Sequence, residues 1–550
     1  VKVNAQSGYR LVNTGFKGMG FKAGLGYDFS VFAKQTTGST TLHVELQDEQ
    51  GKVLATAAIP VSGGNWKEYT ASLKPSAKAM KGKLNIRFEG KGVLDLDNIS
   101  LFPTDTWKGR PKGLRADLVQ LLADLKPGFL RFPGGCIVEG RTLALRYQWK
   151  KTVGNPNDRE LLINRWNNEF AHRLAPDYFQ TFGLGFFEYF QMAEDIGASP
   201  LPILSCGMAC QFNTAELVPM DELDPYVQDA LDLIEFANGP VTSTWGKLRS
   251  DMGHPAPFNL KMIGVGNEQW GTEYIERYKV FEKAIHGKYP EIKIVSGAGP
   301  FPEGEMFEYG WEELKALKAE IVDEHYYRSP QWFLENANRY DSYDRRGPKI
   351  FAGEYAAQSV ATVSPDNKNN WDCALAEAAF MTGLERNADM VHLTSYAPLL
   401  AHSEGWQWTP DLIWFNNLES YGTPNYYVQK LFANHAGTQL LKITEDGKPV
   451  IGQSGLYATA TLDEKAKELV FKIVNASSFE QSFSISVAGK KAAGTKGRLT
   501  VLANNDKNAV NSFEQPQNIF PTEKEVNFTG KDISLSVAPK SVNVLRVAYK

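Results

Sequence analysis

The chain has 550 residues, and its 59 basic and 63 acidic side chains give a formal charge of -4. No long run of one sign is present to bind nucleic acid or an anionic membrane, and no stretch reaches the roughly 18 to 20 apolar residues of a membrane helix. A hydrophobic content of 43% is enough for two or three cores. The chain begins at Val1 without a signal peptide, and we expect a secreted or periplasmic protein with a neutral partner.

Four cysteines, Cys136, Cys206, Cys210 and Cys373, are too few for a disulfide framework. The spacing of Cys206 and Cys210 would suit two metal ligands, but no set of Cys and His partners lies nearby in the sequence, and HExxH is absent. Unpaired cysteine behaves as a small hydrophobe, so we expect buried free thiols. The sequence predicts no cofactor and no metal.

The first segment, residues 1–103, consists of short alternating runs such as 27–34, 40–48 and 83–90, separated by Gly, Asn and Asp. This pattern is typical of a β-sandwich. From about residue 113 the pattern changes, because leucines at helical spacing predict a helix that ends before Pro127.

The second segment, residues 104–435, alternates short apolar strands with amphipathic helices, as repeated βα units around a parallel sheet do. Helices are predicted at 186–197, 225–237, 274–290, 373–388 and 426–437, and strands at 128–135, 200–207, 261–270, 292–299, 320–327, 349–356 and 390–398. Seven strands are one fewer than a closed barrel needs. Residues 436–550 return to alternating runs and predict a second β-sandwich.

Two of the predicted barrel strands end in glutamates: Asn267 and Glu268 follow one strand, and Glu354 follows another. The C-terminal ends of parallel barrel strands are where active sites gather. Each glutamate alone could be a structural ion-pair partner. Together they suit hydrolysis of a glycosidic bond, in which one carboxyl protonates the leaving oxygen and the other attacks the anomeric carbon, about 5 to 5.5 Å apart when configuration is retained.

Other polar residues are placed to support this pair. Asn267 could hydrogen-bond a sugar hydroxyl next to the reacting carbon, although Asn also forms turns. His325 and Tyr327 share one side of their strand, and one of them could hydrogen-bond Glu354. Arg131 lies inside an apolar strand and requires a carboxylate partner; Glu354 is the candidate, and this contact would lower the pKa of the nucleophile.

The loops after the strands add further candidates. Cys136 and Glu139 follow the strand of Arg131 and could line the site, but packing explains a cysteine there equally well. Trp406, Trp408 and Trp414 follow the seventh strand. Exposed, they would be platforms for sugar rings; buried, they would close the top of the barrel. Both alternatives stay open from the sequence.

In the order of the chain, these segments resemble the family 51 glycoside hydrolases, the α-L-arabinofuranosidases of clan A. The similar segments are LRFPGGCIVEG, FGLGFFEYFQMAEDIGA, MGHPAPFNLKMIGVGNEQWG, YPEIKIVSGAG, VDEHYY, GPKIFAGEYA, SYAPLLAH, YGTPNYYVQKLF, NAVNSFEQPQNIFP and SVNVLRVAY. The resemblance implies that Glu268 is the acid/base and Glu354 the nucleophile. It also places residues around the arabinofuranose, namely Arg131, Cys136, Asn267, His325 and Tyr327, although the family often has Asn where this chain has Cys136.

The resemblance implies an α/β plus all-β fold, with a (β/α)8-type barrel between an N-terminal carbohydrate-binding-like β-sandwich and a C-terminal β-sandwich. Clan A enzymes carry the acid/base on the fourth barrel strand and the nucleophile on the seventh. Here Glu268 and Glu354 are on the third and sixth predicted strands. We therefore expect the first strand upstream of this chain, with residues 1–103 as part of a sandwich.

The implied activity is that of a retaining, exo-acting α-L-arabinofuranosidase that removes terminal arabinofuranose from arabinan, arabinoxylan or their oligosaccharides by double displacement. One alternative is a β-xylosidase or endoglucanase of the same clan. Another is a non-catalytic carbohydrate-binding protein. The implied partner is an arabinose-containing polysaccharide or oligosaccharide, with no nucleic acid and no membrane, and a homo-oligomer of unspecified size is compatible with the resemblance.

Overall fold

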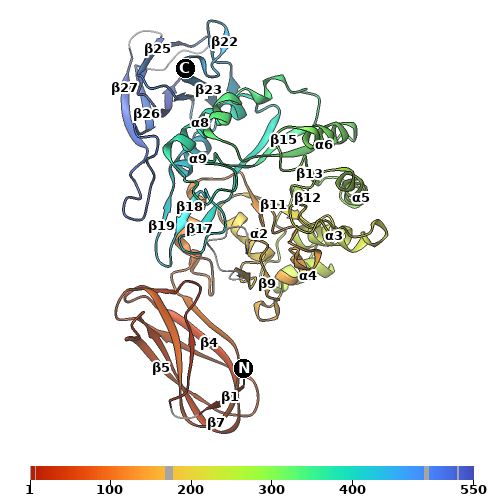
Figure 1. Cartoon of the computed structure of the whole chain (residues 1–550), viewed down its shortest axis with the longest axis vertical. Coiled ribbons are helices and arrows are strands. Elements are labelled where there is room, and N and C mark those ends of the chain that lie inside the picture. Colours follow the sequence, from red (N-terminus) through yellow and green to blue (C-terminus); the bar gives the residue numbers. More distant parts are fainter. Residues whose placement is uncertain (1, 6–7, 168–177, 489–494, 529–531, 550) are drawn as a thin grey trace. The chain divides into compact units, whose positions relative to one another are not determined.

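The computed structural model describes residues 2–5, 8–167, 178–488, 495–528 and 532–549. The chain divides into two compact units, which are described separately below (Figure 1). The first comprises Val1–Leu121, Ala401–Trp406 and Trp414–Ser420, and the second comprises Leu122–Leu400, Gln407–Ile413 and Tyr421–Lys550. None of the described helices combines the length and the apolar character that crossing a membrane requires.

The N-terminal part of the first unit is all-β, as predicted. Two long antiparallel strands, β4 (Tyr27–Gln47) and β7 (Ala79–Pro103), form its centre. Register shifts bend β4, and alternate side chains along it are buried in one apolar core. The other strands of this sheet pair with β4 or β7: β1 (Lys2–Ala5), β2 (Arg10–Asn13), β3 (Met19–Phe21), β5 (Val53–Val61) and β6 (Lys67–Leu73).

The second unit contains a curved parallel sheet in the strand order β16-β15-β14-β13-β12-β11-β8 (Figure 1). Its strands are β8 (Phe129–Phe132), β11 (Ser199–Leu204), β12 (Met262–Val265), β13 (Lys293–Gly297), β14 (Ile321–Tyr326), β15 (Lys349–Tyr355) and β16 (Val391–Tyr396). These are the seven strands that the sequence predicts. Apolar side chains such as Leu201, Val295 and Phe351 fill the concave side, so the barrel interior is packed and the polar residues gather at the strand ends.

Helices connect the strands of this sheet and cover its outer side (Figure 1). Those that the sequence predicts are α1 (Ala116–Asp124), α2 (Phe186–Asp195), α3 (Asp224–Asn238), α5 (Thr272–Lys288), α8 (Trp371–Arg386) and α9 (Pro424–Asn434). The sequence analysis misses α4 (Thr244–Asp251), α6 (Glu305–Ala316) and α7 (Pro330–Glu335). Two of these, α4 and α7, have only 8 and 6 residues, which is too short for a clear helical period.

The C-terminal part of the second unit is a two-layered β structure, as predicted. A six-stranded sheet has the order β20-β23-β24-β29-β26-β27, and β25 pairs with β28. Between them lies an apolar core that includes Phe471, Ile533 and Leu545. The strands are β20 (Gln439–Leu441), β23 (Leu456–Asp463), β24 (Glu468–Asn475), β25 (Gln481–Ser486), β26 (Lys496–Ala503), β27 (Thr522–Asn527), β28 (Asp532–Val537) and β29 (Ser541–Ala548).

Short strand pairs complete the secondary structure. Their bounds are β9 (Leu162–Ile163) with β10 (Phe179–Gln180), β17 (Leu400–His402) with β18 (Ile413–Phe415) and β19 (Ser420–Gly422), and β21 (Thr444–Glu445) with β22 (Lys448–Pro449).

Candidate active site

A bulge in β15 brings Glu354 beside His325. The register between β14 and β15 shifts so that Glu324 pairs with Ala352 and His325 pairs with Glu354, which leaves Gly353 as the extra residue. A Cβ on Gly353 would lie 1.9 Å from Oδ1 of Asp323, so the bulge requires glycine at this position. The irregular register therefore aims the Glu354 carboxylate at the end of β14.

The carboxylate of Glu354 is buried and held at both oxygens. Arg131 donates from Nη1 to Oε1 at 2.8 Å, and the Tyr327 hydroxyl donates to Oε2 at 2.8 Å. The predicted contacts of Glu354 with Arg131 and Tyr327 are thus confirmed. Burial opposes ionisation, but the charges of His325 and Arg131, with the hydrogen bonds from Tyr327 and Arg131, outweigh it and lower the pKa of Glu354.

Glu268 follows β12 with a left-handed backbone (φ +55°), which is uncommon for a residue with a side chain. Its Oε1 atom lies 2.8 Å from Nδ1 of His325, and the thiol of Cys136 donates to its Oε2 atom at 3.3 Å. Glu268 therefore combines an unfavourable backbone conformation with a side chain that His325 and Cys136 hold in one direction. Such strain is common in active sites.

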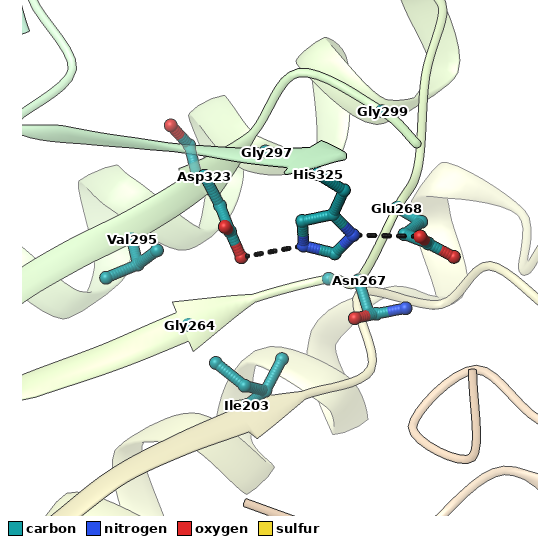
Figure 2. Close-up of a pocket in the computed structure, with 11 residues that line it drawn as sticks. Ile203, Gly264, Asn267, Glu268, Val295, Gly297, Gly299, Asp323 and His325 are labelled. Atoms are coloured by element: carbon teal, nitrogen blue, oxygen red, sulfur yellow. Dashed lines mark hydrogen bonds and ion pairs between the residues drawn. The ribbon is translucent and has the colours of Figure 1, made fainter. Parts of the chain in front are cut away.

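His325 connects Glu268 to a third carboxylate, that of Asp323 (Figure 2). The Nε2 atom of His325 lies 3.2 Å from Oδ2 of Asp323. Burial lowers the pKa of His325, but the neighbouring Glu354, Asp323 and Glu268 carboxylates more than reverse this and raise it well above its usual value. His325 is therefore an imidazolium that donates from both ring nitrogens.

The two glutamates that the sequence singles out lie close together. One carboxylate oxygen of Glu268, one of Glu354 and one ring nitrogen of His325 all lie within 4.8 Å of one another. Next to Glu268 is a small cavity of about 10 Å³, enough for about one water molecule, which Asn267 and His325 also line (Figure 2).

The side chain of Asn267 is buried and fixed in orientation. Its Oδ1 atom accepts from Nη2 of Arg131 at 2.6 Å, and its Nδ2 atom donates to Oε2 of Glu139 at 3.2 Å. Gln269 also donates to Glu139, at 2.9 Å. Since the Arg131 guanidinium bonds both Asn267 and Glu354, it ties the ends of β12 and β15 together.

The structure brings together all seven residues that the sequence analysis selects: Arg131, Cys136, Asn267, Glu268, His325, Tyr327 and Glu354. The sequence analysis misses Asp323, although this residue is two positions before His325 and therefore shares its side of β14. It also predicts no hydrogen-bond partner for Glu139. In the structure Asn267 donates to Glu139, and the two residues lie on different loops.

Of the three tryptophans whose role the sequence leaves open, Trp408 lies at the site. Its ring centroid is 5.4 Å from that of Tyr327, in an edge-to-face contact. The indole nitrogen of Trp408 is buried and has no hydrogen-bond partner among the described residues. Trp406 and Trp414 belong to the first unit, where their rings lie 6.2 Å apart.

Comparisons with known proteins agree over most of the chain. Residues 121–345 match a family model described as the α-L-arabinofuranosidase 1 domain, and residues 353–541 match one described as the α-L-arabinofuranosidase C-terminal domain. A solved structure, that of the arabinose-bound MgGH51 α-L-arabinofuranosidase, superimposes with a TM-score of 0.89 and 32% identity over 100% of this chain and 87% of that chain. An arabinofuranosidase from Thermotoga maritima shares the fold, with a TM-score of 0.62 and 20% identity over 79% of this chain and 90% of that one.

Two curated relatives are similar in sequence. The extracellular exo-α-L-arabinofuranosidase of Streptomyces chartreusis is 44% identical over 83% of this chain, which spans 54% of that relative's length. The α-L-arabinofuranosidase 1 of Arabidopsis thaliana is 35% identical over 97% of this chain and 75% of its own length. The chain therefore belongs to glycoside hydrolase family 51, the α-L-arabinofuranosidases.

Proposed function

We propose that this chain is a retaining α-L-arabinofuranosidase in which Glu268 is the acid/base and Glu354 the nucleophile. The observation that carries the proposal is that one oxygen of the Glu268 carboxylate lies within 4.8 Å of one oxygen of the Glu354 carboxylate. Retention requires carboxyl groups about 5 to 5.5 Å apart, whereas inversion requires about 6.5 to 9.5 Å to admit a water molecule between them. The observed spacing supports retention.

In the first step, an oxygen of Glu354 attacks the anomeric carbon while the bond from that carbon to the leaving oxygen breaks. Glu268 gives its proton to the leaving oxygen. The lowered pKa of Glu354 supports its part, because the carboxylate must be ionised to attack. The hydrogen bonds from Arg131 and Tyr327 restrict its direction of attack.

In the second step, the oxygen of a water molecule attacks the same carbon and the ester bond to Glu354 breaks. Glu268, now a carboxylate, takes the proton of that water. His325 positions Glu268 for both steps through its bond to Oε1. Since Cys136 binds the other oxygen, Oε2, a rotation of the Glu268 carboxylate would break both contacts.

Trp408 and Asn267 lie beside the residues that contact Glu354 and Glu268. The ring of Trp408, 5.4 Å from that of Tyr327, offers an aromatic surface for a sugar ring at this end of the site. Asn267, fixed by Arg131 and Glu139, is placed beside the acid/base to bind the hydroxyl next to the reacting carbon.

The substrate class follows from the relatives. The Streptomyces relative is named an extracellular exo-α-L-arabinofuranosidase, and the MgGH51 structure holds arabinose. We propose that this chain removes terminal arabinofuranosyl residues from arabinose-containing polysaccharides and oligosaccharides. The relatives' names do not favour a β-xylosidase or an endoglucanase.

The test is release of 4-nitrophenol from its α-L-arabinofuranoside by the parent protein and by Glu268→Ala, Glu354→Ala and Glu276→Ala. Glu276 is an exposed glutamate of α5 and serves as the matched control. Glu354→Ala should reduce kcat/KM by about 10³-fold or more, because it removes the nucleophile of the first step. Glu268→Ala should lower kcat by about 10²-fold or more, because the second step needs the base, and Glu276→Ala should leave both constants unchanged. Equal activity in all four proteins would refute the proposal.

A further inference from the structure

A second set of potential ligands lies next to the acid/base. One ligand atom each from Cys136, Glu139 and Cys210, namely two sulfurs and a carboxylate oxygen, lie within 4.8 Å of one another. All three residues are buried, and both cysteines are free thiols. Cys136 and Glu139 come from the loop after β8 and Cys210 from the loop after β11, so the fold and not the sequence brings them together.

Backbone hydrogen bonds hold the two loops in place. The amide of Gly140 donates to the carbonyl of Cys136 at 3.1 Å, and the amide of Cys210 donates to the carbonyl of Gly140 at 3.0 Å. The carboxylate of Glu139 is oriented by the side-chain amides of Asn267 and Gln269. The three groups are therefore positioned in advance, as the groups that bind a ligand or ion must be.

The charges around this cluster favour a cation. The three potential ligands are acidic groups, and the carboxylate of Glu268 lies 3.3 Å from the Cys136 sulfur. Arg165, 3.8 Å from the Cys210 sulfur, partly offsets this negative charge.

We propose that Cys136, Cys210 and Glu139 form a binding site for a thiophilic divalent cation such as Zn²⁺ or Cd²⁺, and that the bound cation inhibits the enzyme. Two thiolates and a carboxylate are a ligand set that such ions prefer. Ligand atoms on one tetrahedral ion lie about 3.3 to 3.8 Å apart, so a contraction of about 1 Å closes the site. Binding requires deprotonated ligands and therefore releases protons.

Inhibition follows from the contact between Cys136 and Glu268. The Oε2 atom of Glu268 lies 3.3 Å from the Cys136 sulfur, a spacing that suits two ligands of one ion. A cation bound to Cys136 removes the thiol proton that Glu268 accepts and places a positive charge beside this carboxyl group, which hinders its protonation and so its role as an acid. This consequence rests on the proposed function, whereas binding of the cation does not.

Binding is tested by titrating the reduced protein with Cd²⁺ under nitrogen and recording the ultraviolet charge-transfer band of cadmium thiolates. The parent protein and Cys373→Ser should show the band with an endpoint at one Cd²⁺ per chain, because Cys373 is a buried free thiol of α8 outside the cluster. Cys210→Ser should lose most of the band. No band in the parent protein, or the same band in Cys210→Ser, would overturn the proposal.

Inhibition is tested by measuring activity against Zn²⁺ concentration, each protein being compared with its own metal-free rate. The Zn²⁺ concentration for half-inhibition should rise at least about ten-fold in Cys210→Ser, and a chelator should restore the parent activity. Equal inhibition of both proteins would show that the ion acts elsewhere. If Cys210→Ser does not fold, anomalous diffraction from a Cd²⁺-soaked crystal of the parent decides: a peak between Cys136, Glu139 and Cys210 supports the site, and its absence refutes it.

Discussion

The Nδ1 atom of His325 lies 2.8 Å from Oε1 of Glu268, and the same imidazole bonds Asp323 through Nε2. Asp323→Asn keeps the shape of this contact but removes a negative charge, so the pKa of His325 falls. The imidazolium beside Glu268 then loses its positive charge at lower pH. The basic limb of the pH profile of kcat/KM should move to lower pH in Asp323→Asn, and an unchanged limb would show that His325 does not act through its charge.

The hydroxyl of Tyr327 donates to Oε2 of Glu354. Its removal should shift the pH profile upward, in the opposite direction to Asp323→Asn. In Tyr327→Phe the nucleophile loses a hydrogen bond that stabilises its ionised form, so the pKa of Glu354 rises. The acid limb of kcat/KM should move to higher pH, with a fall of about 10- to 100-fold at the optimum. Tyr309→Phe is the control, because the Tyr309 hydroxyl contacts Thr272 on the protein surface.

Gly135 is required by the close approach of the nucleophile. A Cβ at this position would lie 2.8 Å from Oε1 of Glu354, and the backbone there does not need a positive φ. Gly135→Ala should therefore fold but displace Glu354, lowering kcat/KM by about 10²-fold or more. Gly128→Ala, where the added Cβ meets no atom within 4 Å, should retain activity. Equal rates in the two variants would contradict this reading of the contact.

Glu324 is a fully buried carboxylate with a structural role. It faces away from the site, and its hydrogen-bond donors are Trp311, Tyr326, Tyr340, Tyr343 and Arg339. Glu324→Ala leaves the buried Arg339 charge without its carboxylate partner and removes the acceptor that these donors share, so it should cost about 3 to 5 kcal/mol of unfolding free energy. Denaturant unfolding measures this, with Glu276→Ala as the exposed control; equal midpoints would show that the network contributes little.

Much of this site could be predicted because its residues lie at or near the ends of strands. Glu268, Glu354 and Arg131 all follow or lie in apolar strands, and a parallel sheet places such ends together. Because side chains alternate along a strand, Asp323 and His325 point to one face of β14 and Glu324 points to the other. The sequence alone does not show which of the two neighbouring acidic residues, 323 or 324, faces the site.

Contacts between loops could not be predicted in the same way. The thiols of Cys136 and Cys210 lie close together because backbone hydrogen bonds of Gly140 join their two loops. No local sequence pattern predicts these hydrogen bonds. Likewise, Gly353 reads as an ordinary strand residue, and only the register of β15 against β14 shows that it creates the bulge. The fold follows from periodicity, whereas these details depend on which loops the parallel sheet brings together.

The most direct test of the central claim is to trap the covalent intermediate. Glu268→Ala should accumulate it from an arabinofuranoside with a highly activated aryl leaving group, because that group needs no acid but the second step needs the base. Mass spectrometry of a rapidly quenched digest should find one dehydrated pentose on the peptide that contains Glu354. A pentose on any other residue, or a burst of phenol without labelled protein, would contradict the assignment of Glu354 as the nucleophile.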